Sequence, residues 1–93
     1  MPKAMIAGWL KVDESRLMQS LQEADQKLDQ ADDEVILDFT SVRRIDAKAL
    51  AELERLADRA DAKAVKFGLR GVNVDIYKVL KLMKLAPRFW FRT

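Results

Sequence analysis

Cysteine and histidine are both absent from this chain of 93 residues. Without cysteine there can be no disulfide and no thiolate metal site. Without histidine the chain lacks the most common general base, the most common metal ligand and the side chain that titrates near neutral pH. Only carboxylates and a few hydroxyls remain for chemistry. The composition therefore predicts a protein that is not an enzyme and that holds no metal or other cofactor.

Long apolar segments and linkers between domains are missing as well. No apolar run approaches the roughly 20 residues that span a bilayer, and the first residues lack the apolar core of a secretory signal. The two prolines, Pro2 and Pro87, lie near the two ends, and no repeat or low-complexity linker divides the chain. We expect a single domain over residues 1–93, in the cytoplasm by default.

Acidic and basic residues are distributed unevenly. Residues 1–62 contain 9 Lys and Arg against 14 Asp and Glu, a net charge of −5, whereas residues 63–93 contain 8 against 1, a net charge of +7. Such a split is compatible with a face that binds nucleic acid or an anionic surface. A basic helix and tail beside acidic helices explain it more simply, because Lys78, Lys81 and Lys84 alone are few charges for a nucleic-acid site.

Hydrophobic periodicity predicts strands that alternate with amphipathic helices. Strands are expected at residues 5–12, 35–39 and 64–69, and the second is apolar enough to be covered on both faces. Helices are expected over residues 13–30, 46–60 and 73–86. Asp13, Asp46 and Asn73 stand at their starts, where such side chains cap a helix, and Pro87 is expected to end the third helix.

The predicted helices each have an apolar stripe at helical spacing. The stripes are Leu17, Leu21, Ala24 and Leu28 in the first helix, Leu50, Leu53, Leu56, Ala57 and Ala60 in the second, and Ile76, Val79, Leu80 and Met83 in the third. The order β-α-β-α-β-α indicates an α/β domain with a mostly parallel sheet and helices packed on it. Three strands are few for such a sheet, so we expect another from the tail or from a partner.

Aromatic residues are concentrated near the end of the chain. Trp9, in the first predicted strand, is assigned to the core. Phe89, Trp90 and Phe91 have two interpretations that the sequence leaves open: a lid folded onto the core, or an anchor for a partner or a second copy of the chain.

The segment VILDFTSVRRIDAKAL, residues 35–50, resembles the densest motif of the STAS (anti-sigma factor antagonist) family. The family has an apolar strand ending in Asp-Leu-Ser-Gly-Val and then Ile-Asp-Ser-Ser-Gly-Leu at a helix start. The residues that match in type and spacing are Asp38, Val42, Ile45, Asp46 and Leu50. The resemblance covers roughly residues 5–91. It implies a small STAS-like α/β domain that acts as a non-catalytic protein-interaction module.

The chain departs from the family at the regulated position. Where the family has Asp-Ser-Ser-Gly, this sequence has Asp46-Ala47-Lys48-Ala49. Lys48 stands at the position of the phosphoacceptor serine, and an ammonium group cannot take its place in that switch. Ala49 adds a methyl group where family partners approach closely. The resemblance therefore carries over the fold but not the serine switch.

By this resemblance, the partner surface is the connection and helix start around Asp46. The predicted partner-binding residues are Asp38, Thr40, Ser41, Arg43, Arg44, Asp46, Ala47, Lys48, Ala49 and Leu50. Asp38 and Asp46 have a simpler interpretation as hydrogen-bonding and capping groups, and a Mg²⁺-assisted hydrolase site built on them has little support.

Five other residues of this segment keep two interpretations. Lys48 is either a fixed charge for an acidic partner or a solvated first-turn lysine. Thr40 and Ser41 are weak candidates for phosphorylation, because such hydroxyls are common in turns. The Arg43-Arg44 pair can hold a phosphate or carboxylate, although such a pair is more often solvated.

The family implies a protein partner. Many members act in bacterial transcription regulation by partner switching with an anti-sigma kinase, and others accompany transporters or lipid-trafficking ATPases. We expect constitutive binding to a partner of one of these kinds. A nucleic-acid or anionic-surface binder that uses the basic last third is the alternative from another class.

Overall fold

The computed structural model of the chain describes residues 8–31 and 33–92. Within these residues the strands are β1 (Gly8–Lys11), β2 (Glu34–Asp38), β3 (Lys66–Arg70) and β4 (Trp90–Arg92). The α-helices are α1 (Leu17–Gln30), α2 (Ala47–Ala62) and α3 (Val74–Leu82), and the short 3-10 helices are η1 (Glu14–Arg16) and η2 (Ala86–Arg88).

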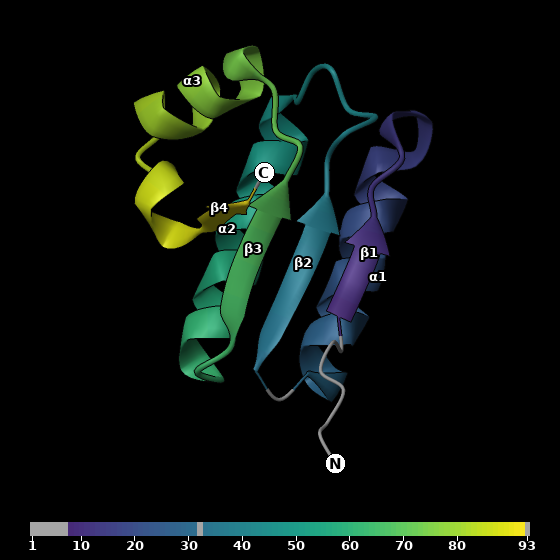
Figure 1. Cartoon of the computed structure of the whole chain (residues 1–93), viewed down its shortest axis with the longest axis vertical. Coiled ribbons are helices and arrows are strands. Elements are labelled where there is room, and N and C mark those ends of the chain that lie inside the picture. The colour runs from purple at the N-terminus through teal and green to yellow at the C-terminus, as the bar shows by residue number, and fades with distance from the viewer. Residues whose placement is uncertain (1–7, 32, 93) are drawn as a thin grey trace.

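The strands form one parallel sheet in the order β1-β2-β3-β4 (Figure 1). Each strand returns through a helical connection, and right-handed crossovers in chain order place successive helices on the same face of a sheet. Figure 1 shows α1 and α2 side by side behind the sheet. The predicted α/β class with a parallel sheet is confirmed, and the tail supplies the fourth strand.

The core lies between the sheet and the helices. On the strands, Val35, Leu37, Phe67 and Leu69 face the helices and are at most 2% exposed. The buried stripes of the helices oppose them, centred on Leu21, Ala24, Leu28, Leu53, Leu56, Ala57, Ile76 and Leu80. The helical spacing seen in the sequence therefore identifies most of the core correctly.

Ion pairs join α1 to α2 at the surface above this core. Arg55 lies 3.1 Å from Asp25, and Arg59 lies 2.6 Å from Asp29 and also contacts Asp25. Hydrogen bonds from the two arginines hold the pKa of Asp25 below its ordinary value, although partial burial of that carboxyl acts in the opposite direction. These pairs fix the two helices side by side.

Several details differ from the sequence predictions. Residues 5–7 of the first predicted strand lie outside the described residues. The strand 35–39 is not covered on both faces, because Ile36 on its second face stays partly exposed. Trp9 is 48% exposed on that same face and is not a core residue. Among the described residues helices cover one face of the sheet only, and Trp9 and Ile36 on the other face are at least partly accessible.

The end of the third helix and the tail also differ from expectation. Helix α3 ends at Leu82, before Pro87, because Lys84 adopts a left-handed backbone with φ 63°. Met83 therefore lies past the helix and is 55% exposed, not buried. The three aromatic residues of the tail differ in burial. Phe89 is buried edge-to-face against Phe67 at 5.6 Å, whereas Trp90 and Phe91 are 58% and 38% exposed.

Candidate functional site

The predicted binding segment lies at the edge of the sheet where parallel strands end. Strand β2 ends at Asp38, and the chain then forms a connection that leads to the first turn of α2 (Figure 1). We call residues 40–50 the rim. Ligands and partners of open α/β sheets usually bind outside the carboxyl ends of the strands. The fold therefore places the rim where such a sheet commonly binds.

Asp38 holds the start of the rim in place. Asp38 is 8% exposed, and its carboxylate accepts hydrogen bonds from the Thr40 amide at 2.9 Å and from the Thr40 hydroxyl. Arg70 lies 3.8 Å away on the neighbouring strand. Burial alone would raise the pKa of Asp38, but the Thr40 hydrogen bonds and the charges of Arg70 and Lys11 lower it below its ordinary value. Asp38 is thus a structural carboxylate whose oxygens already have partners within the protein.

This lowered pKa predicts a pH-dependent contribution of Asp38 to folding. A carboxyl whose folded-state pKa is depressed stabilises the fold fully above its unfolded pKa of about 4, and this stabilisation is lost as pH falls through the folded-state pKa. Asp38→Asn should therefore lower the free energy of unfolding by about 1 kcal/mol at pH 7, because a charged acceptor is replaced by a neutral one.

Urea denaturation of both proteins between pH 7 and pH 2 tests this prediction. The difference between wild type and Asp38→Asn should shrink below about pH 4. A difference that stays constant down to pH 2 would show that the Asp38 charge has no part in holding Thr40.

Three hydrogen bonds to its backbone groups fix the connection before α2, one within the connection and two from the side chains of Glu14 and Asn73. The Val42 amide donates to the Phe39 carbonyl at 2.9 Å, and the Arg43 amide donates to the carboxylate of Glu14 in η1. The Asn73 side-chain amide donates to the Arg43 carbonyl at 3.1 Å, while its oxygen caps α3. The connection is therefore held from both sides although it contains no regular secondary structure.

The first turn of α2 is organised by Asp46. Its side chain accepts a hydrogen bond from the Ala49 amide at 2.9 Å, which is the predicted cap and contributes about 1 kcal/mol. Ala47 and Lys48 are exposed on this turn, whereas Ala49 is 0% exposed and Leu50 is half-buried against the core. The methyl group of Ala49 therefore packs inside the protein and does not face a partner, contrary to the sequence expectation.

The polar and charged rim side chains are exposed to solvent, whereas Val42 is buried. Thr40, Ser41, Arg43 and Arg44 are exposed together with Lys48. Within residues 40–50 the charged groups are Arg43, Arg44, Lys48 and Asp46, a net charge of +2. The structure thus brings the predicted site residues into one continuous segment that has a basic surface and a fixed backbone.

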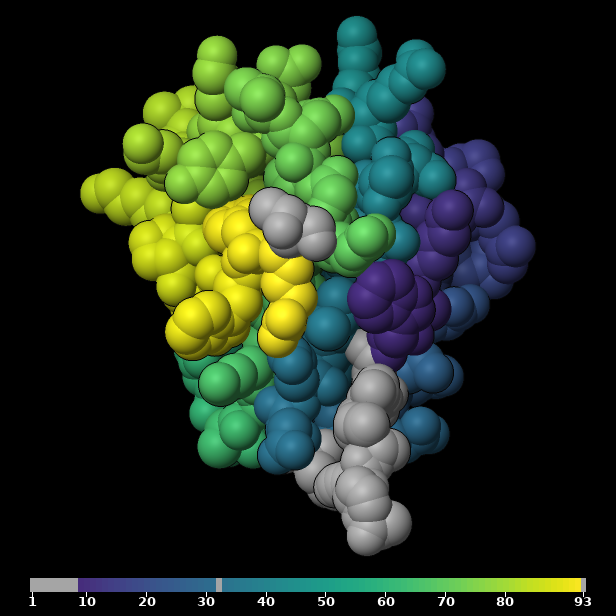
Figure 2. Space-filling view, viewed as in Figure 1, coloured from purple at the N-terminus to yellow at the C-terminus, as the bar shows by residue number. Residues whose placement is uncertain are grey.

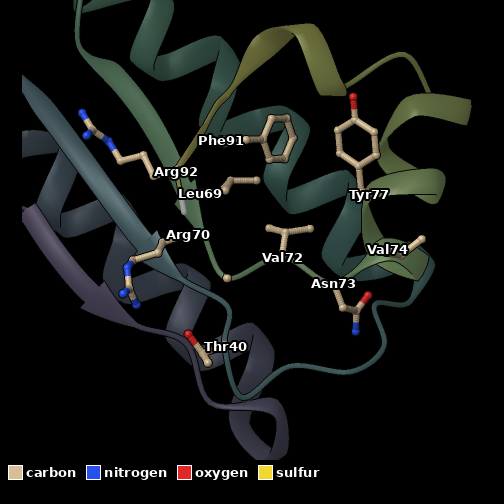
Figure 3. A pocket seen from close by; sticks show the side chains of 10 residues that line it. Thr40, Leu69, Arg70, Val72, Asn73, Val74, Tyr77, Phe91 and Arg92 are labelled. Atoms are coloured by element: carbon tan, nitrogen blue, oxygen red, sulfur yellow. The ribbon is translucent and has the colours of Figure 1, made fainter.

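A pocket that the sequence analysis missed lies next to Thr40 (Figure 3). It has a volume of about 550 Å³ and is bounded by the ends of β3 and β4 and by the start of α3. Its walls are mostly apolar, with Leu69, Val72, Tyr77 and Phe91 pointing into it in Figure 3. Tyr77 and Phe91 meet edge-to-face at 5.1 Å. No sequence signal joined these residues, because they lie in three separate elements.

A second, smaller hollow of about 220 Å³ lies between the connection and α3. Arg43, Arg44 and Ile45 line it from the rim, and Asp75, Ile76 and Val79 line it from α3. The rim is therefore flanked by two concave surfaces, both shared with α3.

Ion pairs neutralise part of the basic charge in the last third of the chain. Arg88 pairs with Asp58 and Asp61 at 2.8 Å, and Arg92 pairs with Glu34 at 2.5 Å. Lys78, Lys81 and Lys84 are exposed in and after α3. These lysines form a short stripe without interleaved aromatic rings, which single-stranded nucleic-acid sites normally add. The structure gives the nucleic-acid alternative no support at this face.

Among residues 8–31 and 33–92 no group of three or more carboxylates is gathered as a metal site would require. Likewise, none of the helices in residues 8–31 and 33–92 combines the length and apolarity needed to cross a bilayer.

Comparison with known proteins connects this geometry to a family. The model of the STAS domain matches residues 11–93. Two solved structures of TM1081 from Thermotoga maritima, described as a candidate anti-sigma factor antagonist, share the fold. The solution structure has a TM-score of 0.76 at 16% identity over 97% of this chain and 77% of that one, and the crystal structure has 0.71 at 18% identity over 96% and 76%.

A comparison with curated proteins found no match. The family model spans both the rim and the sheet that supports it, and the two solved structures have the same fold as this chain. The chain therefore belongs to the STAS domain family.

Proposed function

We propose that this STAS domain is a non-catalytic protein-interaction module that binds its partner through the rim without a phosphorylation switch. One observation carries the proposal. The backbone of the rim is anchored by Asp38, Glu14 and Asn73, while its charged side chains are exposed. A surface that is already ordered loses little conformational entropy on binding, which favours affinity.

The chemistry of the rim favours an acidic partner surface. Arg43, Arg44 and Lys48 are exposed on one segment, and Asp46 is engaged in capping α2. Complementary charge speeds association and selects against basic partners. Family members bind anti-sigma kinases or accompany transporter and lipid-trafficking ATPases, and we propose a protein of one of these kinds as the partner.

Lys48 makes the binding constitutive in this proposal. It takes the place of the regulated serine of the family, and it is exposed in the first turn of α2 without an ion pair among the described residues. A positive charge at a helix N-terminus is mildly unfavourable. Binding to acidic groups of a partner would offset that cost, and no kinase can remove the charge by phosphorylation.

Charge reversal at Lys48 tests the proposal. Lys48→Glu should weaken binding to the cognate anti-sigma kinase or transporter ATPase at least about tenfold, which is about 1.4 kcal/mol. The same change should slightly stabilise the free domain, because a carboxylate near a helix N-terminus is favourable by about 0.3–1 kcal/mol. Calorimetric titration and thermal melts measure the two effects separately.

Lys63→Glu is the matched control. Lys63 is an exposed lysine at the opposite end of the same helix, so its reversal changes the net charge equally. Affinity unchanged by Lys63→Glu and reduced by Lys48→Glu would support the rim. Equal effects of the two variants would mean that only the overall charge matters and would contradict the proposal.

A further inference from the structure

Helix α3 and the turn after it carry a concentration of exposed apolar side chains. Of the seven large hydrophobic residues that are exposed among the described residues, four lie between positions 74 and 83. Leu82 is the most exposed of the seven at 80%, and Met83 beside it is 55% exposed. Apolar side chains that are exposed together at one place mark a surface that binds something.

The way in which α3 ends explains why these two side chains are exposed. Leu82 follows the buried Leu80 by two positions, which is about 200° around the helix, so it faces away from the core. The left-handed backbone of Lys84 then turns the chain, and the Leu85 amide donates to the Leu80 carbonyl at 2.8 Å. In a helix end of this type the residue after the left-handed one returns to the core. Leu85 is accordingly 5% exposed, and Met83 is left in solvent.

Three lysines surround the two apolar residues. Lys78 lies one helical turn before Leu82 on the same side of α3, and Lys81 and Lys84 flank the Leu82-Met83 pair along the chain. All three lysines are exposed, and none lies within ion-pair distance of a carboxylate among the residues that the structure describes. We call the five residues together the α3 tip: Lys78, Lys81, Leu82, Met83 and Lys84.

The surroundings of the α3 tip do not neutralise its charge. Residues 76–93 contain no Asp or Glu, and Asp75 lies at the other end of α3, in its first turn. The end of α3 packs against η2, where Arg88 already pairs with Asp58 and Asp61. Figure 1 shows α3 on the side of the molecule away from α1 and β1, and in Figure 2 its yellow-green surface forms an outer shoulder there. The α3 tip is therefore an outlying surface that is both apolar and cationic.

From these features we infer that the α3 tip docks the domain on an anionic membrane surface, with Leu82 and Met83 inserted among the lipid headgroups and the three lysines against lipid phosphates. Exposed apolar residues next to lysines on a short helix are typical of segments that lie at a membrane interface. Each lysine near an anionic leaflet strengthens binding about fivefold. Three lysines and two apolar side chains together give a reversible attachment and not a permanent anchor.

Other occupants fit the α3 tip less well. A stable protein interface covers about 800 Å² on each partner, whereas the α3 tip is one turn of chain that lines neither of the two hollows beside the rim. A fluid bilayer needs no matching shape, because lipids move around an inserted side chain. A second copy of the chain would bring like charges together. The α3 tip also has no aromatic ring on which a nucleic-acid base could stack.

Co-sedimentation of the intact chain with lipid vesicles tests the inference. One probe is a vesicle of phosphatidylcholine and phosphatidylglycerol in equal parts, and the other is a vesicle of phosphatidylcholine alone. We expect saturable binding to the anionic vesicles that weakens as salt is raised. Binding to the neutral vesicles should be at least about tenfold weaker, because the lysines lose their attraction to the surface.

Three variants localise the binding. Lys81→Glu should weaken binding to the anionic vesicles at least about tenfold, because it removes an attraction and adds a repulsion. Leu82→Ser should weaken it about tenfold without changing the charge, because the inserted apolar side chain is lost. Lys63→Glu is the matched control: it changes the net charge as Lys81→Glu does, but it lies between α2 and β3 and should leave binding unchanged. All three positions are exposed, so the fold should persist, and thermal melts check this.

Several outcomes would overturn the inference. They are no binding to the anionic vesicles, whether or not polyglutamate or a single-stranded oligonucleotide binds instead, equal binding to both kinds of vesicle, and equal losses with Lys81→Glu and Lys63→Glu. Full binding by Leu82→Ser would also overturn it, as would sedimentation without vesicles that Leu82→Ser abolishes, which indicates a second copy. The assay contains no protein partner, and Lys48→Glu should bind the vesicles as wild type does, so failure of this inference would leave the rim proposal intact.

Discussion

Replacing Phe39 with alanine is expected to lower the free energy of unfolding by about 3–5 kcal/mol, as for other fully buried phenylalanines. Phe39 is 0% exposed and is the first residue after β2. Its amide donates to the Arg70 carbonyl at 2.7 Å, and its carbonyl accepts from Val42 at 2.9 Å. The buried side chain and these two backbone hydrogen bonds together fix the point from which the rim begins.

This loss is large relative to the total free energy of unfolding. Domains of this length are stable by about 5–15 kcal/mol, so Phe39→Ala would leave a marginal fold. Phe91→Ala is the matched control, because Phe91 is 38% exposed and the same atoms are removed from a partly solvated site. Urea denaturation should show a loss several times smaller for Phe91→Ala. Similar losses for both would mean that Phe39 does not anchor the core as its burial indicates.

Gly71→Ala is expected to lower the free energy of unfolding by about 2–4 kcal/mol. Alanine is strained in a left-handed backbone, and its methyl group would also overpack the site. Gly71 follows β3 with φ 72°. A Cβ atom there would lie 2.5 Å from Thr40 Oγ1 and 3.0 Å from the Thr40 Cα and N atoms. Because backbone atoms cannot move aside as a flexible side chain can, the substitution should displace the start of the rim.

Gly68→Ala separates this effect from the loss of glycine in general. A Cβ atom at Gly68 would be 3.4–3.5 Å from the ends of Glu34, Arg92 and Ile36, which are ordinary contacts with side chains. We expect a change within about 1 kcal/mol in thermal or urea unfolding. Gly71→Ala should also reduce partner affinity, whereas Gly68→Ala should not change binding at the rim. Equal stability of the two variants would show that Thr40 is not held against Gly71.

Local patterns in the sequence predicted much of the fold. Asp46 and Asn73 cap α2 and α3 as expected, because a capping side chain bonds an amide within three residues. The stripes around Leu21 and Leu53 are buried because helical spacing already defines one face of a helix. These features depend on neighbours along the chain and need no knowledge of the tertiary arrangement.

Features that depend on distant partners could not be predicted. The alternation of β1 places Trp9 on one face, but only the position of the helices decides which face is covered. Glu14 reaches Arg43, 29 residues away, and Asn73 reaches the carbonyl of Arg43, 30 residues away. Composition gives no signal for either contact. The same holds for the pocket beside Thr40, whose walls come from β3, β4 and α3.

The structure exposes most of the predicted site segment but not every residue of it. Thr40, Arg43 and Lys48 are exposed on the rim, but Ala49 belongs to the core. Asp38 and Asp46 are occupied by hydrogen bonds within the chain. Two carboxylates that already hold the rim in shape are poorly suited to bind a metal ion, which favours their structural interpretation over a Mg²⁺-assisted reaction.

Mass spectrometry after incubation with the cognate anti-sigma kinase and ATP tests the central claim most directly. The wild-type chain should remain unmodified and keep its affinity for the partner, whereas the Lys48→Ser variant, which restores a hydroxyl at the regulated position, should gain one phosphoryl group. A phosphoryl group on Thr40 or Ser41 of the wild-type chain, with loss of partner binding, would contradict a rim that cannot be switched off.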